Sequence, residues 1–293
     1  MMKLIRLCYF AIAAMMVSAS PSLAKINVVA SFSILGDMVE QVAGDKANVT
    51  TIVGPDADAH LYQPNTGDGV AVADADLIIT NGMGFETWST TLIESSGTKA
   101  KIAVATDGIA PLLVDGEIDP HAWNSLLNGM IYVTNIEAAL SAVSPENAPT
   151  FKANADAYRA KLQMLHNHAL AEIAKLPQEK RIVVTAHDAF GYLENAYGLT
   201  FLAPQGIDTD AEPSAKELAA LISFLNETGA GALFVENISN GDLIAQISRE
   251  TGLTIGGRIY SDALSVKGSP ATSYLAMFTH NLELLTATLN AAQ

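Results

Sequence analysis

A long helical stretch near the middle of the chain most restricts the folds that this sequence can adopt. It begins at Ser144-Pro145-Glu146, where a serine N-cap, a proline at the first helical position and an acidic first turn favour a helix start. It ends near Leu176-Pro177, so about thirty residues at ~1.5 Å each predict a helix of about 45 Å. A helix of that length can link two lobes as a rigid strut.

Strands alternate with helices on both sides of this helix. The predicted strands are residues 25–32, 48–53, 77–80 and 102–105 in the first half, and 181–185, 199–202, 233–235 and 253–255 in the second. The predicted helices are residues 34–42, 66–73 and 85–94 before the long helix, and 190–197, 214–228, 241–251 and 273–291 after it. Such alternation is typical of α/β lobes with mainly parallel sheets.

We therefore predict an α/β fold of two lobes, each with a mainly parallel four-stranded sheet flanked by helices, joined by one long rigid backbone helix. The predicted N-terminal lobe spans residues 25–143, the linking helix 144–177 and the C-terminal lobe 178–293. The 293 residues, 49% of them hydrophobic, are sufficient for more than one domain.

The first 24 residues have the order of a secretory signal peptide. Lys3 and Arg6 precede an apolar run at residues 7–17, and Ser22-Leu23-Ala24 offers a small-residue cleavage site. An uncleaved anchor is the alternative, but the apolar run is too short to span a bilayer. We predict export to a bacterial periplasm, with cleavage near Ala24.

The composition of the remaining chain excludes several kinds of site. The only cysteine of the sequence, Cys8, lies in the predicted signal, among residues that do not resemble a lipid-attachment site. The chain that remains after cleavage is therefore expected to have neither disulfides nor thiolate ligands. The formal net charge is −15, and removal of Lys3 and Arg6 with the signal makes it −17. Such an acidic chain is not expected to bind nucleic acid, whose affinity comes largely from Lys and Arg.

Three of the six histidines lie where a metal site could form. His60 and His187 follow predicted strands, and His121 follows Pro120, which stiffens an irregular segment. The other three are in predicted helices. His166 and His168 point about 200° apart on the long helix and are expected to be solvated, and His280 is expected at the surface or in the core.

An aspartate, Asp262, lies in a loop of the second half, beyond the last predicted strand. Ligands of open α/β sheets bind beyond the carboxyl ends of the strands, so two facing lobes would bring these edges together. The separations exclude a local zinc finger or a His-Glu-x-x-His helix. Each residue taken alone is also typical of an ordinary turn. A calcium loop starting at Asp56 is excluded, because His60 and Leu61 occupy positions that need an oxygen ligand and a glycine.

Four motifs resemble those of a known family, the zinc- and manganese-binding solute-binding proteins of bacterial ABC transporters (cluster A-I). They are Gly54-Pro55-Asp56-Ala57-Asp58-Ala59-His60-Leu61-Tyr62-Gln63-Pro64, Asp119-Pro120-His121-Ala122-Trp123, Ala186-His187-Asp188-Ala189-Phe190-Gly191-Tyr192 and Tyr260-Ser261-Asp262-Ala263-Leu264. The resemblance covers essentially the whole mature chain. It implies metal binding between two lobes, with His60 and His121 as ligands from the first lobe and His187 and Asp262 from the second. Gln63 and Asn124-Ser125 depart from the family's usual residues.

The ligand set implied by the resemblance favours Zn²⁺, with Mn²⁺ as the alternative. Members that handle manganese or iron commonly have glutamate at the position of His187, and imidazole suits zinc whereas manganese prefers carboxylate oxygen. Three imidazoles and one carboxylate form a closed tetrahedral zinc shell. The segment 112–118 is short and lacks histidine, so this would be a zinc-type member without the long His-rich loop.

The expected function is periplasmic capture of zinc and its delivery to the membrane permease of an ABC transporter for import. A periplasmic metallochaperone is an open second partner, and the protein is expected to be a monomer. A zinc-dependent hydrolase is the alternative from another class, but a fourth protein ligand would close the position that catalytic zinc leaves to water. A surface adhesin is a third class. His60 and Asp262 are the ligands most worth testing as mobile ones, and Asp58, Asp188 and Asn237 are candidates to orient the imidazoles.

Overall fold

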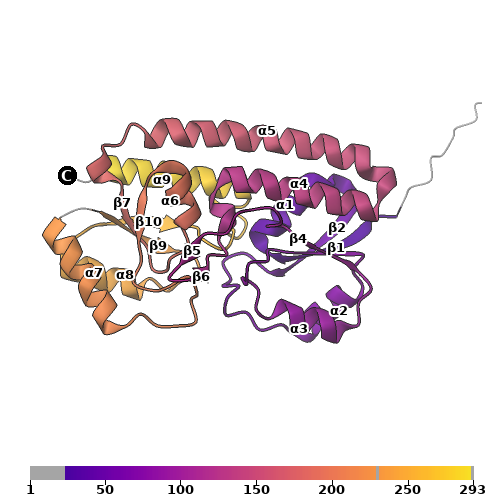
Figure 1. Ribbon diagram of the computed structural model, residues 1–293, viewed down its shortest axis with the longest axis horizontal. Helices are drawn as coiled ribbons and strands as arrows, with labels where there is room; N and C mark the ends of the chain where they lie inside the picture. Colours follow the sequence, from indigo (N-terminus) through magenta and orange to yellow (C-terminus); the bar gives the residue numbers. More distant parts are fainter. Residues whose placement is uncertain (1–23, 229–230, 292–293) are drawn as a thin grey trace, which may run out of the picture.

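Two α/β lobes lie side by side beneath one long helix (Figure 1). The structure is a computed structural model that describes residues 24–228 and 231–291. The predicted signal peptide therefore lies outside the described residues, except for Ala24. The predicted fold class is confirmed, because each lobe contains a four-stranded, fully parallel sheet.

The N-terminal lobe is built on the strand order β2-β1-β3-β4. Its strands are β1 (Ile26–Phe32), β2 (Ala47–Val53), β3 (Leu77–Thr80) and β4 (Lys101–Val104). Its helices are α1 (Ser33–Ala43), α2 (Thr66–Ala73), α3 (Ser89–Ser96) and α4 (Leu126–Val143). The last five residues of β1 are all buried, as expected for a central parallel strand covered on both faces.

The C-terminal lobe repeats this arrangement with the strand order β10-β9-β7-β8. Its strands are β7 (Ile182–Val184), β8 (Thr200–Leu202), β9 (Ala232–Glu236) and β10 (Ile255–Ile259). Its helices are α6 (Gly191–Tyr197), α7 (Ala215–Thr228), α8 (Asp242–Thr251) and α9 (Tyr274–Ala291). In both lobes the parallel strands therefore place their carboxyl ends at one edge of the sheet.

The linking helix, α5, is shorter than the sequence predicts. It spans Ala148–Ile173, 26 residues, and a separate 3₁₀ turn at Pro145–Asn147 precedes it. Ser144 does not cap a backbone N–H with its side chain, because its hydroxyl donates instead to the Glu146 carboxylate at 2.5 Å. In Figure 1 the helix extends over both lobes, above α4 and α9.

The sequence prediction missed one helix and misplaced several boundaries. Helix α4 was not predicted, although its buried residues Leu126, Gly129, Tyr132, Val133, Ile136 and Leu140 recur at helical spacing. Its length and mean hydropathy of 1.2 would suit a membrane span, but it packs against α1 and α5 as a core helix does. A short hairpin, β5 (Leu113–Val114) and β6 (Glu117–Ile118), was also missed, and α3 and β10 begin later than predicted.

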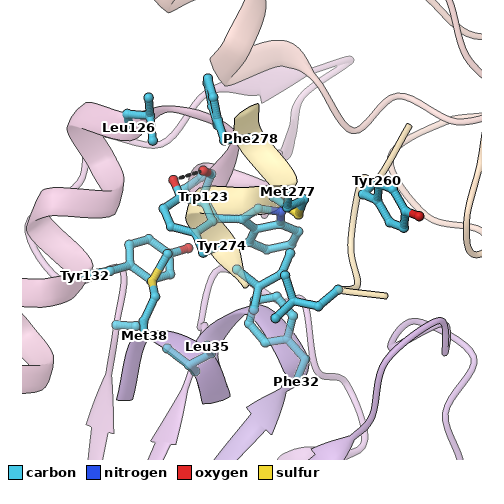
Figure 2. Close-up of a cluster of buried hydrophobic side chains, with 14 of the residues drawn as sticks. Phe32, Leu35, Met38, Trp123, Leu126, Tyr132, Tyr260, Tyr274, Met277 and Phe278 are labelled. Atoms are coloured by element: carbon cyan, nitrogen blue, oxygen red, sulfur yellow. Dashed lines mark hydrogen bonds between the residues drawn. The ribbon is translucent and has the colours of Figure 1, made fainter. Parts of the chain in front are cut away.

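Large aromatic side chains fill the core between the lobes. Figure 2 shows Trp123 and Tyr274 in contact at its centre, with Phe32 and Tyr132 around them. The Tyr274 hydroxyl donates to the Trp123 carbonyl at 2.5 Å, and the Trp123 indole N–H donates to the Ser261 carbonyl at 2.8 Å. Trp123 therefore joins segments of the two lobes immediately beside His121 and Asp262.

Candidate metal centre

The four residues predicted from the sequence converge between the lobes. One donor atom from each of His60, His121, His187 and Asp262 lies within 4.8 Å of the others. The side chains are 0–3% exposed, so the cluster is almost sealed from solvent. No other group of three or more histidine, cysteine or acidic side chains with this spacing occurs within residues 24–228 and 231–291.

The spacing of the donor atoms matches a tetrahedral metal shell. The Oδ2 atom of Asp262 lies 3.1 Å from His187 Nε2, 3.3 Å from His60 Nε2 and 3.7 Å from His121 Nε2. The Nε2 atoms of His60 and His121 are 3.3 Å apart. A tetrahedron with zinc–ligand bonds of ~2.05 Å has edges of about 3.3 Å. Four of the six edges are therefore close to the length that zinc requires.

Each ligand candidate comes from a loop at the facing edges of the two sheets. His60 follows β2, His187 follows β7 and Asp262 follows β10. His121 lies beyond the β5–β6 hairpin, directly after Pro120 and at the start of the short 3₁₀ turn Ala122–Asn124. Its φ and ψ of −82° and 41° are non-helical, and Pro120 fixes its own φ immediately before it.

A carboxylate faces the second nitrogen of every imidazole. Asp119 Oδ1 lies 2.8 Å from His121 Nδ1, Glu236 Oε2 lies 2.6 Å from His187 Nδ1, and Asp208 Oδ1 lies 3.1 Å from His60 Nδ1. A carboxylate at Nδ1 fixes the tautomer with its proton on Nδ1, so that the Nε2 lone pair faces the centre. This arrangement is the one that orients histidine ligands in metal sites.

Without a metal, the carboxylates favour protonation of the cluster. Burial lowers the pKa of His187, but the charges of Glu236 and Asp262 outweigh burial and hold this pKa well above its usual value. Burial likewise lowers the pKa of His60, yet its hydrogen bonds to Asp208 and Asp262 raise it to about 9. Burial raises the pKa of Asp262, but the neighbouring histidines hold it well below its usual value. A metal ion must displace these protons, so its affinity increases with pH.

Apolar rings surround the imidazoles on the N-terminal side. Phe85 contacts His60 edge to face, with ring centroids 4.8 Å apart, and Trp123 contacts His121 with centroids 5.3 Å apart.

Asp262 Oδ1 is buried and has no hydrogen-bond partner among the described residues. A buried carboxylate oxygen without a partner is costly unless a cation binds it, which fits a metal at this position.

The residues predicted to orient the imidazoles were the wrong ones. Asp58 accepts from the backbone N–H of His60, not from its ring, at 2.8 Å, and Asn237 donates to Asp56 and to the Ala263 carbonyl. Among the described residues, the Asp188 side chain forms no hydrogen bond or ion pair with an imidazole; its backbone N–H donates to the Gly206 carbonyl. The Asp-Pro-His motif and the strand-end position of Glu236 offered signals for Asp119 and Glu236. No local pattern pointed to Asp208.

The remaining histidines lie apart from the cluster, and one prediction about them was wrong. His166 is 7% exposed, not solvated, because its ring packs against Tyr197 and its Nδ1 lies 3.0 Å from the Tyr197 hydroxyl. The side chain of His168 is 55% exposed, as predicted. His280 Nε2 lies 3.0 Å from the Arg258 carbonyl.

Removing the charge of Glu236 is expected to weaken metal binding without unfolding the protein. Glu236 Oε1 accepts from the backbone N–H groups of Ala186 at 2.8 Å and His187 at 3.0 Å. In Glu236→Gln the amide oxygen has to keep this place, so the amide NH2 faces the Nδ1–H of His187 and disfavours the metal-binding tautomer. We expect a loss of affinity of about 10- to 100-fold in a competitive zinc titration. Glu194→Gln is the matched control, because Glu194 accepts from the Phe201 N–H and lies outside the cluster. Equal affinities for the two variants would contradict the role assigned to Glu236.

Comparison with protein families gives one match that covers most of the chain. The family model described as "Zinc-uptake complex component A periplasmic" matches residues 28–288. The match therefore includes both lobes, the linking helix and all four residues of the cluster.

Individual relatives carry names that refer to three different metals. The chain is 33% identical to the manganese-binding lipoprotein MntA of Halalkalibacterium halodurans, over 90% of this chain and 89% of that protein. It is 35% identical to the iron ABC transporter substrate-binding lipoprotein MtsA of Streptococcus pyogenes, over 88% of this chain and 87% of that protein. Among solved structures, the periplasmic zinc binding protein TroA of Treponema pallidum has a TM-score of 0.87 and 28% identity, covering 91% of this chain and 99% of that chain.

Proposed function

Because the chain belongs to the family of periplasmic zinc-uptake component A proteins, which are metal-binding components of ABC transporters and not enzymes, we propose that it captures Zn²⁺ between its lobes. The ion is bound by His60, His121, His187 and Asp262. The protein then delivers the ion to a membrane permease for import. It acts as a monomer, and a periplasmic metallochaperone is a second candidate partner that would load the ion.

The observation that best supports zinc is the donor set together with its spacing. Three imidazole nitrogens and one carboxylate oxygen surround one point, and four of their six separations are 3.1–3.7 Å. Imidazole suits zinc better than it suits manganese, and zinc favours four ligands in a tetrahedron. Each Nδ1 also faces a carboxylate, which increases the basicity of the metal-binding nitrogen.

Manganese or iron is the second candidate, and two observations favour it. The relatives MntA and MtsA are named for manganese and iron. In addition, Asp262 Oδ1 is buried and has no hydrogen-bond partner among the described residues. This oxygen lies on the same carboxylate as the Oδ2 that faces the histidines, so Asp262 could bind through both oxygens. Coordination beyond four ligands with more oxygen is what manganese prefers.

The cellular location also belongs to this proposal. MntA and MtsA are named as lipoproteins. In this chain the only cysteine is Cys8, which precedes most of the apolar run of the predicted signal. We therefore propose a periplasmic protein that begins near Lys25 after cleavage. Mass spectrometry of the mature protein tests this, because a lipid-modified N-terminus or an intact signal would give a larger mass.

Elemental analysis provides the direct test of the cargo. Protein purified from its native compartment is expected to contain one zinc per chain, and competitive titrations are expected to rank zinc above manganese. Manganese or iron in place of zinc, with matching titrations, would establish the second candidate instead. Absence of stoichiometric metal in both measurements would contradict the proposed function.

Replacing His187 by glutamate is expected to shift selectivity from zinc towards manganese. The change substitutes a hard oxygen for an imidazole nitrogen, so zinc affinity should fall more than manganese affinity, by about tenfold or more in their ratio. The new carboxylate would face Glu236, which lies 2.6 Å from His187 Nδ1, so both affinities should also decrease. The double variant H187E/E236Q removes this repulsion.

The measurement is a competition titration with both metals for each variant. His168→Gln is the control, because His168 is exposed on α5 and lies apart from the cluster. An unchanged zinc-to-manganese ratio in His187→Glu would contradict the assignment of His187 as a ligand.

A further inference from the structure

One of the three imidazole-orienting carboxylates differs from the other two. Asp119 and Glu236 are fully buried and lie in the same lobe as the histidines they face, His121 and His187. Asp208 belongs to the C-terminal lobe, whereas its partner His60 belongs to the N-terminal lobe. The Asp208 side chain is 50% exposed, so water competes for this contact and not for the others.

The loop that contains Asp208 is anchored within the C-terminal lobe beside another ligand candidate. The backbones of Gln205 and His187 pair in an isolated parallel β-bridge, and the Gly206 carbonyl accepts from the Asp188 N–H at 3.1 Å. The Gln205 side-chain amide then donates to the carbonyls of Thr209 at 2.9 Å and Ala211 at 2.8 Å. These bonds hold residues 205–211 in place relative to the C-terminal lobe.

The same loop makes a second contact with the His60 segment across the lobe boundary. The Thr209 hydroxyl donates to Asp58 Oδ2 at 2.7 Å, and Asp58 Oδ1 accepts from the His60 N–H at 2.8 Å. Asp208 and Thr209 therefore contact both the ring of His60 and the aspartate that fixes its backbone. Both contacts depend on the lobes lying together.

Beside His121 and Asp262 the two lobes are joined differently. There Trp123 forms buried hydrogen bonds with Ser261 and Tyr274. Figure 2 shows Trp123 and Tyr274 within the aromatic core. Breaking those bonds would expose the aromatic core, whereas separating residues 205–211 from His60 and Asp58 would break two polar contacts, one of them made by the half-exposed Asp208. Local opening is least costly where few apolar contacts are lost.

We propose that Asp208 is a positioning residue that orients His60 for metal binding only while the lobes are closed, so that loss of this contact opens the route by which the metal leaves. This inference rests on the proposed metal-binding function and identifies the residue that regulates release at that site. His60 is then the ligand that moves, whereas Asp262 stays with the buried side. Of the two ligands that the sequence singled out for mobility, His60 and Asp262, we therefore propose that only His60 moves.

Stopped-flow measurement of zinc release to a chelator tests the role of Asp208. Asp208→Ala should release zinc about 10- to 100-fold faster than wild type, because no carboxylate then accepts from the Nδ1–H of His60 to orient its Nε2 towards the ion. Asp208→Asn should stay within a few-fold of wild type, because its amide oxygen still accepts from the Nδ1–H. Asp210→Ala removes the same charge from the same loop and should release zinc at nearly the wild-type rate.

A spectroscopic readout separates positioning from general destabilisation. In the zinc-bound protein with ¹⁵N-labelled histidine, the Nδ1 proton of His60 should be observed in wild type, Asp208→Asn and Asp210→Ala. It should exchange with water and disappear in Asp208→Ala. Thermal unfolding of the metal-free variants checks the fold, and Asp208→Ser provides a second polar truncation with the same expected result.

Three outcomes would overturn the inference. The first is an equal release rate in Asp208→Ala and Asp210→Ala, which would indicate only an effect of charge. The second is release from Asp208→Asn as fast as from Asp208→Ala. The third is an unchanged Nδ1 signal of His60 in Asp208→Ala. These outcomes differ from failure of the proposed function. If wild-type protein does not bind stoichiometric zinc, that function is wrong, whereas normal wild-type binding with unaffected variants contradicts only the role of Asp208.

Discussion

Replacing Asp262 by alanine is expected to lower zinc affinity by about a thousandfold. Asp262 provides the only anionic atom among the four converging donors, and its Oδ2 lies 3.1–3.7 Å from all three Nε2 atoms. Without it a dication would be buried among neutral imidazoles. Breaking a buried ion pair by removing one partner costs about 3–5 kcal/mol, which corresponds to a factor of about one hundred to several thousand.

The measurement is a competitive titration of zinc against a chelating dye. Asp188→Asn is the matched control, because Asp188 adjoins His187 but its side chain forms no hydrogen bond or ion pair with the four residues of the cluster among the described residues. We expect its zinc affinity to stay within a few-fold of wild type. If Asp262→Ala retained wild-type affinity, the proposed site would be wrong, whatever its geometry. Metal-free Asp262→Ala should remain folded, because the aromatic core around Trp123 does not depend on the carboxylate.

Zinc is expected to raise the unfolding temperature of the protein strongly, since the four donors come together only in the native state and the ion therefore stabilises that state. A ligand present at a thousand times its Kd stabilises the native state by about 4 kcal/mol. For a chain of this size about 2–4 °C per kcal/mol is typical, so the expected increase is about 8–16 °C. A chelator should reverse it completely.

Calorimetry with two comparisons makes this result specific. Mg²⁺ prefers oxygen ligands and octahedral geometry, so the same concentration of Mg²⁺ should leave the unfolding temperature unchanged. Asp262→Ala should lose most of the increase with zinc. An equal effect of zinc on wild type and Asp262→Ala would show that the ion binds elsewhere, for example to the acidic surface. A larger increase with manganese than with zinc would favour the second candidate function.

Much of the fold was predictable because its signals are local. Alternating apolar strands and helices with capping residues indicated two parallel sheets, and the register of β1 with its two neighbours agrees with that prediction. Helix α4 shows the limit of this reasoning. Its periodicity was present and Ser125 stands at its N-cap position, but the serine side chain forms no capping hydrogen bond and Gly129 is a weak helix former in its first turns. In the structure Gly129 is needed because a Cβ there would lie 2.7 Å from the Tyr274 hydroxyl.

The sequence by itself determined the chemistry of the candidate site. His60, His121, His187 and Asp262 could be selected because three imidazoles and a carboxylate beyond strand ends form a recognisable donor set, and their motifs resemble one family. The structure then brings their donor atoms within 4.8 Å. A donor set can be recognised from residue types and their order, because metal preference depends on the ligand atoms themselves.

Only the tertiary structure decided what surrounds those donors. The burial of His166 against Tyr197 and the pairing of His187 with Glu236 depend on how helices and strands pack, which local periodicity does not encode. The contact of Asp208 with His60 depends further on how the two lobes meet. The sequence specifies which atoms can bind a metal, and the packing of the lobes specifies which carboxylates orient them, because orientation requires contacts between segments that are distant in the chain.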